Sequence, residues 1–185
     1  IFTNIGTAHN EGFTSLEQKI SEKLTLFSGV EKLIYCSDHN PLHAAILATD
    51  VPSFCWGFHE QADLQIIQSG NGLIIKWADQ THTLLLPFKD QASVENCLHC
   101  VALMLYLGYT FQTIQERISL LKVVPMRLEL KEGINNCQII DDSYNNDLGG
   151  LRISVDFLAG IQKKKKTLII SDILQSGLED NELIE

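Results

Sequence analysis

The sequence predicts an α/β protein: a mostly parallel sheet flanked by helices with an antiparallel meander, followed by a truncated Rossmann-like α/β domain. In the first 60 residues, short apolar segments rich in β-branched residues alternate with segments of helical periodicity. Residues 64–87 change to three alternating segments separated by turn sequences, and a new α/β pattern begins after Pro125. These three observations define the predicted fold class.

The first elements are a strand at residues 1–5 and a helix at about 15–28. The strand is apolar and β-branched, as a buried strand is, and because it opens the chain we expect further sequence upstream of it. The helix begins at a capping-box pattern of Ser15 and Gln18, and its apolar residues recur at helical spacing until Gly29.

The other strands of this first domain follow in order. Apolar segments predict strands at 32–36 and 53–58, and a helix opened by a proline near its first turn is predicted between them at 41–49. The antiparallel meander is predicted at residues 64–68, 73–77 and 83–86.

Two helices close the first domain, at about 92–108 and 110–121. Pro125 then interrupts the helical pattern, so we expect a boundary that separates residues 1–126 from residues 127–185. The second domain is predicted to contain strands at 127–130, 137–140 and 167–170 and a helix at 148–160.

Composition narrows the class of protein. The 185 residues carry a formal charge of -9, from 14 basic and 23 acidic residues, which disfavours general nucleic-acid binding. The one basic run, Lys163–Lys166, is short and typical of a solvated loop. No apolar run approaches the roughly 20 residues that span a bilayer. Five dispersed cysteines favour a reducing compartment, and we therefore expect a cytoplasmic protein without a membrane segment.

Two residues near the start of the chain could belong to a metal site. His9 follows the first strand, at the edge where open α/β sheets place their active sites; a structural or exposed loop histidine is the alternative. Lys23 shares a helix face with apolar residues, so we expect its amine to point toward packed surface or a site. A lysine at the edge of the core is the alternative.

Polar groups that could contact a nucleotide occur later in the chain. Asn96 stands early in a helix, where its amide could recognise a flat heterocycle, although helix-start polarity explains it equally well. Asp142 follows a strand, where its carboxylate could hold a ribose or metal, or serve only as a turn residue. Cys97 and Cys100 have no second pair at zinc-ligand spacing, which disfavours a metal role.

Several of these residues belong to motifs that occur in one order along the chain. The motifs are Thr3-Asn4-Ile5-Gly6-Thr7-Ala8-His9-Asn10-Glu11-Gly12-Phe13, Lys23 ahead of Phe27, Glu95-Asn96, Val124-Pro125-Met126-Arg127-Leu128 and Asp141-Asp142-Ser143-Tyr144-Asn145. Over residues 1 to 175 they resemble the signatures of the Mur ligase family. The likeness is to members that add D-alanyl-D-alanine to UDP-N-acetylmuramoyl-tripeptide, and residues 171–177 further resemble such ligases fused to an alanine racemase.

The resemblance implies a cytoplasmic ligase of peptidoglycan synthesis that uses ATP and Mg²⁺ and forms an acyl phosphate. It implies that His9 and a carbamylated Lys23 bind the metal ion. It also implies that Asn96 contacts adenine, Arg127 reaches the terminal phosphate and Asp142 holds the ribose. The residues Ser143, Tyr144 and Asn145 of the same motif are implied to face the substrate or the space between domains.

The chain also departs from the family pattern. Met126 stands where the family usually has glycine, and residues 90–99 differ from the family's G-x-H-N-x-x-N-A-L-A-like segment. No G-x-x-x-x-G-K-[ST] phosphate loop occurs, so we expect that loop upstream and no activity from this chain alone. Two alternatives stay open: a ligase like folylpolyglutamate synthetase, and a non-catalytic remnant or partner-binding module with a ligase-like fold.

Overall fold

The structure is a computed structural model that describes residues 1–6, 12–70, 72–88, 90–122, 128–144, 148–171 and 173. The chain divides into two compact units, one of residues 1–5 with 17–122 and one of residues 6–16 with 123–185. The predicted boundary between residues 126 and 127 lies outside the described residues and stays a prediction.

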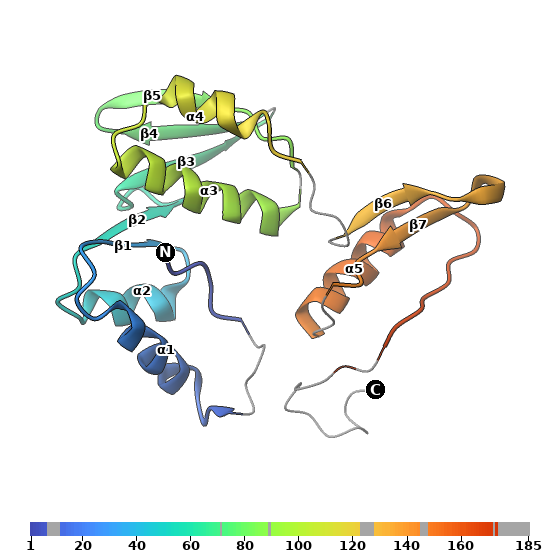
Figure 1. Ribbon diagram of the computed structural model, residues 1–185, viewed down its shortest axis with the longest axis horizontal. Helices are drawn as coiled ribbons and strands as arrows, with labels where there is room; N and C mark the ends of the chain where they lie inside the picture. The colour runs from blue at the N-terminus through green and yellow to red at the C-terminus, as the bar shows by residue number, and fades with distance from the viewer. Residues whose placement is uncertain are drawn as a thin grey trace. The chain divides into compact units, whose positions relative to one another are not determined.

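The first unit is built on a mixed sheet of five strands in the order β1-β2-β3-β4-β5, which can be followed in Figure 1. The strands are β1 (Leu33–Cys36), β2 (Ser53–Gly57), β3 (Leu64–Ser69), β4 (Gly72–Trp77) and β5 (Gln80–Leu84). The pairs β1–β2 and β2–β3 are parallel, whereas β3–β4 and β4–β5 are antiparallel. A parallel sheet with an attached meander was predicted, and this prediction is confirmed.

The N-terminal segment extends the parallel part of the sheet. Phe2 pairs with Tyr35 of β1 in a parallel bridge, and its amide donates to the Ile34 carbonyl at 2.8 Å. The predicted strand at residues 1–5 is thus reduced to a single bridge. Because parallel strands end at the same edge, the residues after Phe2 approach the carboxyl edge of β1 and β2.

Helices cover both faces of this sheet (Figure 1). One face packs against α1 (Leu16–Leu24), which continues as a short 3₁₀ turn at Thr25–Phe27, and against α2 (Asn40–Leu47). The other face packs against α3 (Gln91–Tyr106) and α4 (Phe111–Ile118). The predicted helices are therefore present, with the first one shorter than expected.

Local sequence explains where these helices begin. Pro41 stands in the first turn of α2, where its missing N–H costs no hydrogen bond. The Asp90 carboxylate caps α3 by accepting from the Ser93 amide at 2.8 Å. The Thr110 hydroxyl caps α4 by accepting from the Thr113 amide at 3.2 Å. Each cap satisfies a backbone donor that a helix start would otherwise leave without a partner.

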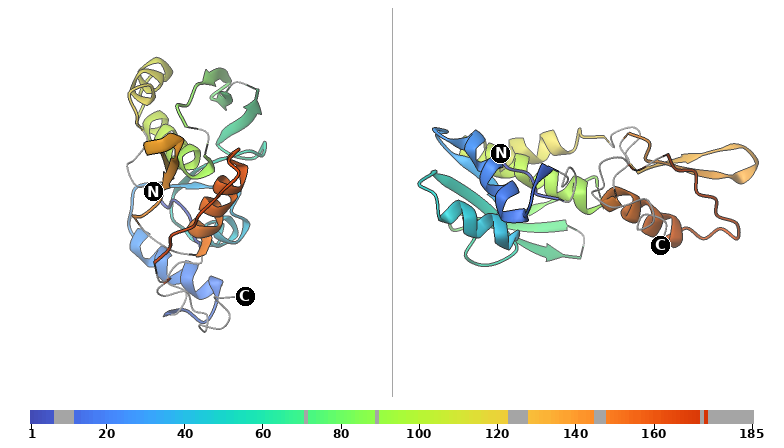
Figure 2. Two further views of the ribbon diagram at one scale, coloured as in Figure 1. Left: turned by 90° about the vertical axis from the view of Figure 1, so that its right-hand side faces the viewer. Right: turned by 90° about the horizontal axis from the view of Figure 1, so that it is seen from below.

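The second unit contains an antiparallel hairpin and a helix. Its elements are β6 (Glu129–Glu132), a 3₁₀ turn at Ile134–Asn136, β7 (Gln138–Asp141) and α5 (Leu148–Gly160). In Figure 2 the hairpin extends beyond the end of α5. The hairpin turn uses left-handed backbone at Asn135 and Asn136, a conformation that asparagine tolerates better than most residues.

The predicted strand at 167–170 is wrong for this structure. These residues are described as irregular, and the Ile169 side chain is 92% exposed. A strand needs a neighbour for its backbone hydrogen bonds, and in the described part of the second unit the sheet consists of β6 and β7 paired with each other. Apolar, β-branched composition alone therefore did not produce a strand here.

Two general expectations can be compared with the structure. All five cysteines are described and carry free thiols, as a reducing compartment allows. Among the described residues, no helix combines the length and the apolar character needed to cross a membrane.

Candidate functional site

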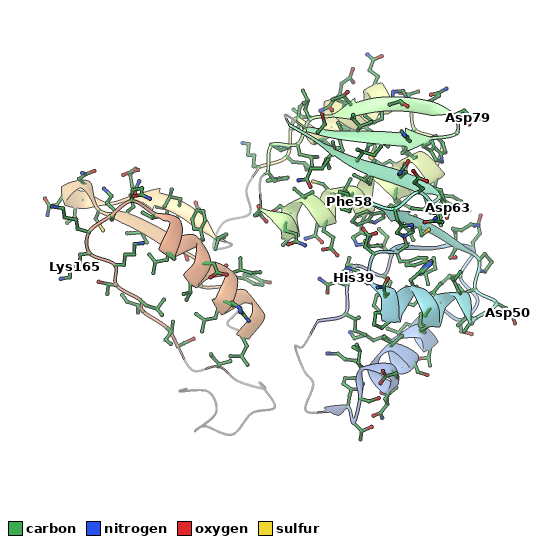
Figure 3. All side chains as sticks on the ribbon, turned by 180° about the vertical axis from the view of Figure 1, so that it is seen from behind. His39, Asp50, Phe58, Asp63, Asp79 and Lys165 are labelled. Carbon is green, nitrogen blue, oxygen red and sulfur yellow. The ribbon has the colours of Figure 1, made fainter. Side chains whose placement is uncertain are left out.

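Several polar residues of the first unit follow the carboxyl ends of the parallel strands β1 and β2. β1 leads into Ser37, Asp38 and His39, and β2 leads into Phe58 and His59. His39 stands at the N-cap position of α2 but its side chain forms no capping hydrogen bond, and Figure 3 shows it at the opposite end of that helix from Asp50. This edge is the usual position of ligand sites in open α/β sheets.

Asp38 holds the ends of β1 and β2 together. Its two carboxylate oxygens accept from the Phe58 amide at 3.1 and 3.0 Å, and the Nε2 atom of His59 lies 3.7 Å from Oδ1. Gly57 is required beside it, because a Cβ atom there would lie 2.5 Å from the Ser37 hydroxyl oxygen. A side chain at residue 57 would therefore have to displace the side chains of Ser37 and Asp38.

Asn96 lies on α3 next to this edge, and its side chain is exposed. The preceding residue, Glu95, accepts from His39 across the edge, with 2.9 Å between Nε2 and Oε1. The start of α3 is thereby attached to the start of α2. An exposed amide in this position is free to contact a flat heterocycle, so the predicted role of Asn96 stays a prediction that the geometry permits.

His99, one turn after Asn96, is buried with 1% of its surface exposed. The indole N–H of Trp56 donates to its Nδ1 atom at 3.0 Å, and its Nε2 atom lies 2.8 Å from the Thr3 carbonyl oxygen. Burial is the main cause that lowers the pKa of this imidazole below its usual value. The hydrogen bonds connect the N-terminal segment, β2 and α3 at one point.

We expect the protein to lose stability in acid because of His99. Its folded-state pKa lies below the unfolded value of about 6.5, so the unfolded chain binds more protons as the pH falls through that range. The contribution of neutral His99 to the free energy of unfolding is fully present at pH values above the unfolded-state pKa. It is lost as the pH falls toward the lowered folded-state pKa. Urea unfolding at pH 7.5 and pH 5 would measure it. A His99→Asn variant should show a smaller pH dependence between these values, and an unchanged dependence would contradict this assignment.

Lys23 occupies the last turn of α1, and its side chain is exposed. The expectation that its amine points toward packed surface is therefore wrong, and the other expectation, that the amine points toward a site, stays a prediction. The buried residues of α1 are Lys19 and Ile20, and Leu24 and Phe27 pack partly buried against the same core, so the apolar face of this segment is present without Lys23. Burial and the charge of Lys23 lower the pKa of the Lys19 amine. The predicted carbamylation of Lys23 itself stays a prediction.

Lys23 fits a magnesium ion as a ligand on the condition that its amine is carbamylated. An ammonium group repels Mg²⁺, but a carbamate formed on the same nitrogen supplies the anionic oxygen that this ion prefers. The exposed amine of Lys23 can react with dissolved carbon dioxide. Within the described residues, no three His, Cys, Asp or Glu side chains gather as a metal site, and His9 lies outside those residues.

The second unit places Asp142 at the end of β7, where it binds its own neighbours. One carboxylate oxygen accepts from the Leu128 amide at 3.0 Å and the other accepts from the Ser154 hydroxyl of α5. Among the described residues, these two hydrogen bonds use two of the roughly four acceptor positions of the carboxylate. Arg127 and Asn145, which were predicted to act with Asp142, lie outside the described residues.

Asp141, Ser143 and Tyr144 of the same motif lie at the end of β7 and in the segment that follows it. Asp141 accepts from Lys131 at 2.6 Å and from the Ser143 hydroxyl at 2.7 Å, and the Lys131 hydrogen bond is the main cause that holds the Asp141 pKa low. The Tyr144 side chain is 58% exposed. Ser143 therefore contacts its own turn, and the predicted substrate roles of Ser143 and Tyr144 stay predictions.

Leu128 has a backbone φ of +49°, a left-handed conformation that is strained for a leucine. Replacing Asp142 with alanine removes the acceptor of its amide, a hydrogen bond to a charged group worth roughly 1.5–3 kcal/mol. We expect the Leu128 amide to exchange its hydrogen about tenfold faster or more, as measured by NMR. Asp156→Ala, an exposed change on α5, is the matched control, and equal exchange in the two variants would contradict this prediction.

The sequence analysis did not identify the side chains that join the structural elements meeting at this edge of the sheet. His39, Trp56 and His99 are not among the residues that the sequence analysis predicts for the site. A signal was present for His99, since it interrupts the apolar residues Leu98, Val101 and Ala102 on a face of α3 that is otherwise core. A histidine at such a position requires partners, although the sequence does not say which ones.

No protein-family model matches the chain. Among curated proteins, the UDP-N-acetylmuramoyl-tripeptide–D-alanyl-D-alanine ligase of Bacillus subtilis is 28% identical over 182 residues, which is 96% of this chain and 40% of that protein. The corresponding ligase of Escherichia coli is 26% identical over 193 residues, or 97% of this chain and 42% of that protein. The chain thus spans about two fifths of the length of these relatives.

Solved structures show the same fold. MurF from Acinetobacter baumannii superimposes with a TM-score of 0.74 over 95% of this chain and 40% of that chain, at 20% identity. MurF ligase from Thermotoga maritima in complex with ADP gives 0.64 over 84% of this chain and 38% of that chain, at 21% identity. These comparisons confirm the predicted fold class and the predicted resemblance to Mur ligases.

Proposed function

We propose that this chain, a homologue of the Mur ligases, is part of an ATP-dependent amide ligase of peptidoglycan precursor synthesis. The ligase joins D-alanyl-D-alanine to UDP-N-acetylmuramoyl-tripeptide. The observation that carries the proposal is the match of 96% of the chain to a relative with that name, because a match of this extent runs through both units.

The proposed reaction has two steps. An oxygen of the tripeptide's terminal carboxylate attacks the terminal phosphorus of ATP, which releases ADP and leaves an acyl phosphate. The free amine of D-alanyl-D-alanine then attacks the acyl carbon, inorganic phosphate leaves, and the amine loses a proton. The product is an amide, and one ATP is consumed for each bond formed.

The residues of this chain are proposed to position the reactants. Asn96 would contact the adenine and Asp142 the ribose, which together fix the nucleotide. Arg127 would offset the negative charge that develops on the transferred phosphoryl group. His9 and Lys23, the latter as its carbamate, would hold Mg²⁺. When bound, the ion neutralises charge on the phosphate oxygens and orients the terminal phosphate for attack.

Two further proposals concern the context of the reaction. We place it in the cytoplasm, because free thiols such as those of Cys100 and Cys137, both exposed, persist in a reducing compartment. We also propose an alanine racemase domain in the complete protein, on the basis of the motif at residues 171–177. Conversion of L-alanine to D-alanine by the complete protein would test it, and absence of that activity would contradict it.

An acceptor assay tests the proposed function. The complete protein that contains this chain would be supplied with ATP, Mg²⁺ and UDP-N-acetylmuramoyl-tripeptide, with D-alanyl-D-alanine as the second substrate. In parallel it would be offered L-glutamate with a folate, the substrates of a folylpolyglutamate synthetase. We expect ADP release and a new amide only in the first mixture. Activity only in the second would favour the folate enzyme, and activity in neither would favour a non-catalytic remnant.

A further inference from the structure

The carboxylate of Asp142 is held by hydrogen bonds from two separate segments of the second unit. The Leu128 amide, just before β6, donates to its Oδ1 atom at 3.0 Å, and the Ser154 hydroxyl of α5 donates to its Oδ2 atom. Each oxygen therefore has a donor of its own. Because the two donors belong to different segments, the carboxylate cannot rotate without losing one of them.

The single proton of the Ser154 hydroxyl goes to this carboxylate. Two acceptors lie within its reach, the Asp142 carboxylate and the Gly150 carbonyl oxygen, which lies 3.1 Å away and one turn earlier on α5. The carboxylate is the nearer acceptor and is charged, and hydrogen bonds to a charged acceptor are roughly twice as strong as neutral ones. Ser154 therefore connects α5 to the end of β7 instead of bonding only within its own helix.

The neighbouring carboxylate, Asp141, has a different set of donors. It accepts from Lys131 of β6 at 2.6 Å and from the Ser143 hydroxyl at 2.7 Å. Its contacts thus lie within the hairpin and the turn that follows it, whereas Asp142 is bound to α5. The two adjacent carboxylates can therefore be perturbed separately, one through Lys131 and the other through Ser154.

Hydrogen bonds have a large share in holding this region together, because the described part of the second unit contains no buried side chain. All described residues of β6, β7 and α5 are half-buried or exposed. Close packing of apolar side chains is what usually keeps a polar group in place after one of its hydrogen bonds is lost. We therefore expect the orientation of Asp142 to depend on its donors.

We propose that Ser154 is a positioning residue, which holds the Asp142 carboxylate in the orientation that binds the ribose of the nucleotide. This inference rests on the proposed function, in which Asp142 contacts the ribose. A carboxylate that the protein already holds loses little conformational entropy when a ligand binds, and such preorganisation raises affinity. Ser154 acts through Asp142 and is not itself a ligand of the nucleotide.

Four variants of the complete protein isolate the Ser154 hydroxyl. Ser154→Ala removes it and does not weaken α5 by itself, because alanine favours a helix more than serine does. Ser154→Cys keeps a side chain of similar shape with a thiol that is only a weak donor, and Ser154→Thr keeps a hydroxyl. Lys131→Met is the matched control, since it removes a donor from the neighbouring Asp141 and leaves both donors of Asp142 in place.

Binding is measured by calorimetry with ADP and with 2′,3′-dideoxy-ADP, which lacks both ribose hydroxyls. We expect Ser154→Ala and Ser154→Cys to weaken ADP binding about three- to tenfold, the range expected for the ordering of one side chain, and to change binding of the dideoxy nucleotide less than about twofold. Ser154→Thr and Lys131→Met should stay within about twofold of the unmodified protein for both nucleotides. In turnover, the KM for ATP should rise in Ser154→Ala while kcat changes less than about twofold, since the ribose takes no part in the chemical step.

A second readout needs no nucleotide. Exchange of the Leu128 amide hydrogen reports how firmly Asp142 holds that amide, and mass spectrometry with fragmentation to single residues measures it. We expect this exchange to be about threefold faster in Ser154→Ala and unchanged in Ser154→Thr. If Ser154→Ala does not fold, Ser154→Cys provides the same two measurements.

Failure of the inference and failure of the proposed function give different results. If the unmodified protein binds ADP and the dideoxy nucleotide equally, the ribose contact of the proposed function is contradicted and the inference falls with it. If the unmodified protein prefers ADP but Ser154→Ala weakens both nucleotides equally, or neither, only the positioning role is overturned. Unchanged exchange of the Leu128 amide in Ser154→Ala, or equal effects of Ser154→Ala and Lys131→Met on ADP binding, would overturn it as well.

Discussion

Replacing Lys23 with alanine in the complete protein is expected to lower kcat by about 10³-fold or more, while ATP binding is retained. The physical reason is that the carbamate of Lys23 is the proposed anionic oxygen ligand for Mg²⁺, and loss of metal-based charge neutralisation costs several kcal/mol in the transition state. Because the side chain is exposed and packs against little, the substitution should leave the fold intact. Turnover and ATP binding would be measured on the same preparation.

Two further variants separate the carbamate from simple positive charge. Lys23→Arg keeps the charge, but a guanidinium does not form the carbamate, so we expect it to be as inactive as Lys23→Ala. Lys76→Ala removes an exposed lysine from β4 and should have no effect. Full turnover by Lys23→Arg would show that the carbamate is unnecessary, and the proposed metal site would then be wrong.

Replacing Trp56 with alanine is expected to give the largest loss of stability, about 3–5 kcal/mol. Trp56 is 1% exposed, lies in the core between the sheet and α3, and is among the largest fully buried side chains. Its removal leaves a cavity and also leaves the Nδ1 atom of His99 without its donor. Since domains are stable by only about 5–15 kcal/mol, the variant should be close to unfolding at room temperature. Denaturant unfolding would measure the change.

The other tryptophan provides the control for this prediction. Trp77 lies on β4, is only partly buried and packs at the margin of the same core. We expect Trp77→Ala to cost clearly less than Trp56→Ala. Trp56→Phe, which keeps an aromatic ring but not the indole N–H, should be intermediate. If Trp56→Ala and Trp77→Ala lowered the free energy of unfolding equally, the placement of Trp56 in the centre of the core would be contradicted.

Much of the fold could be predicted because local patterns and tertiary contacts agree. The alternation in β3 to β5 matches one buried face per strand, and Gly108, in left-handed backbone, ends the long helix α3 as expected. The prediction was wrong where tertiary contacts decide. Residues 167–170 have strand composition but no strand partner among the described residues, and Lys23 is exposed although Ile20, Leu24 and Phe27 of the same helical segment pack on the core.

The sequence could predict individual residues of the candidate site but not the contacts between them. Motif spacing identified Lys23, Asn96 and Asp142, but the attachment of Thr3 to His99 joins positions that no local pattern relates. The same holds for His39 and Glu95, which are 56 residues apart. Such contacts depend on which strands end at the same edge and on the register of α3, and both are set by packing of the whole unit.

Transfer of oxygen from the tripeptide to phosphate is the most direct test of the proposed reaction. The terminal carboxylate of UDP-N-acetylmuramoyl-tripeptide would be labelled with ¹⁸O at both oxygens and incubated with the complete protein, ATP, Mg²⁺ and D-alanyl-D-alanine. If the carboxylate is phosphorylated, the bridging oxygen leaves with the phosphate, so each inorganic phosphate released should carry one ¹⁸O atom. Amide formation with unlabelled phosphate would contradict an acyl phosphate, and with it the account given for Lys23, Arg127 and Asp142.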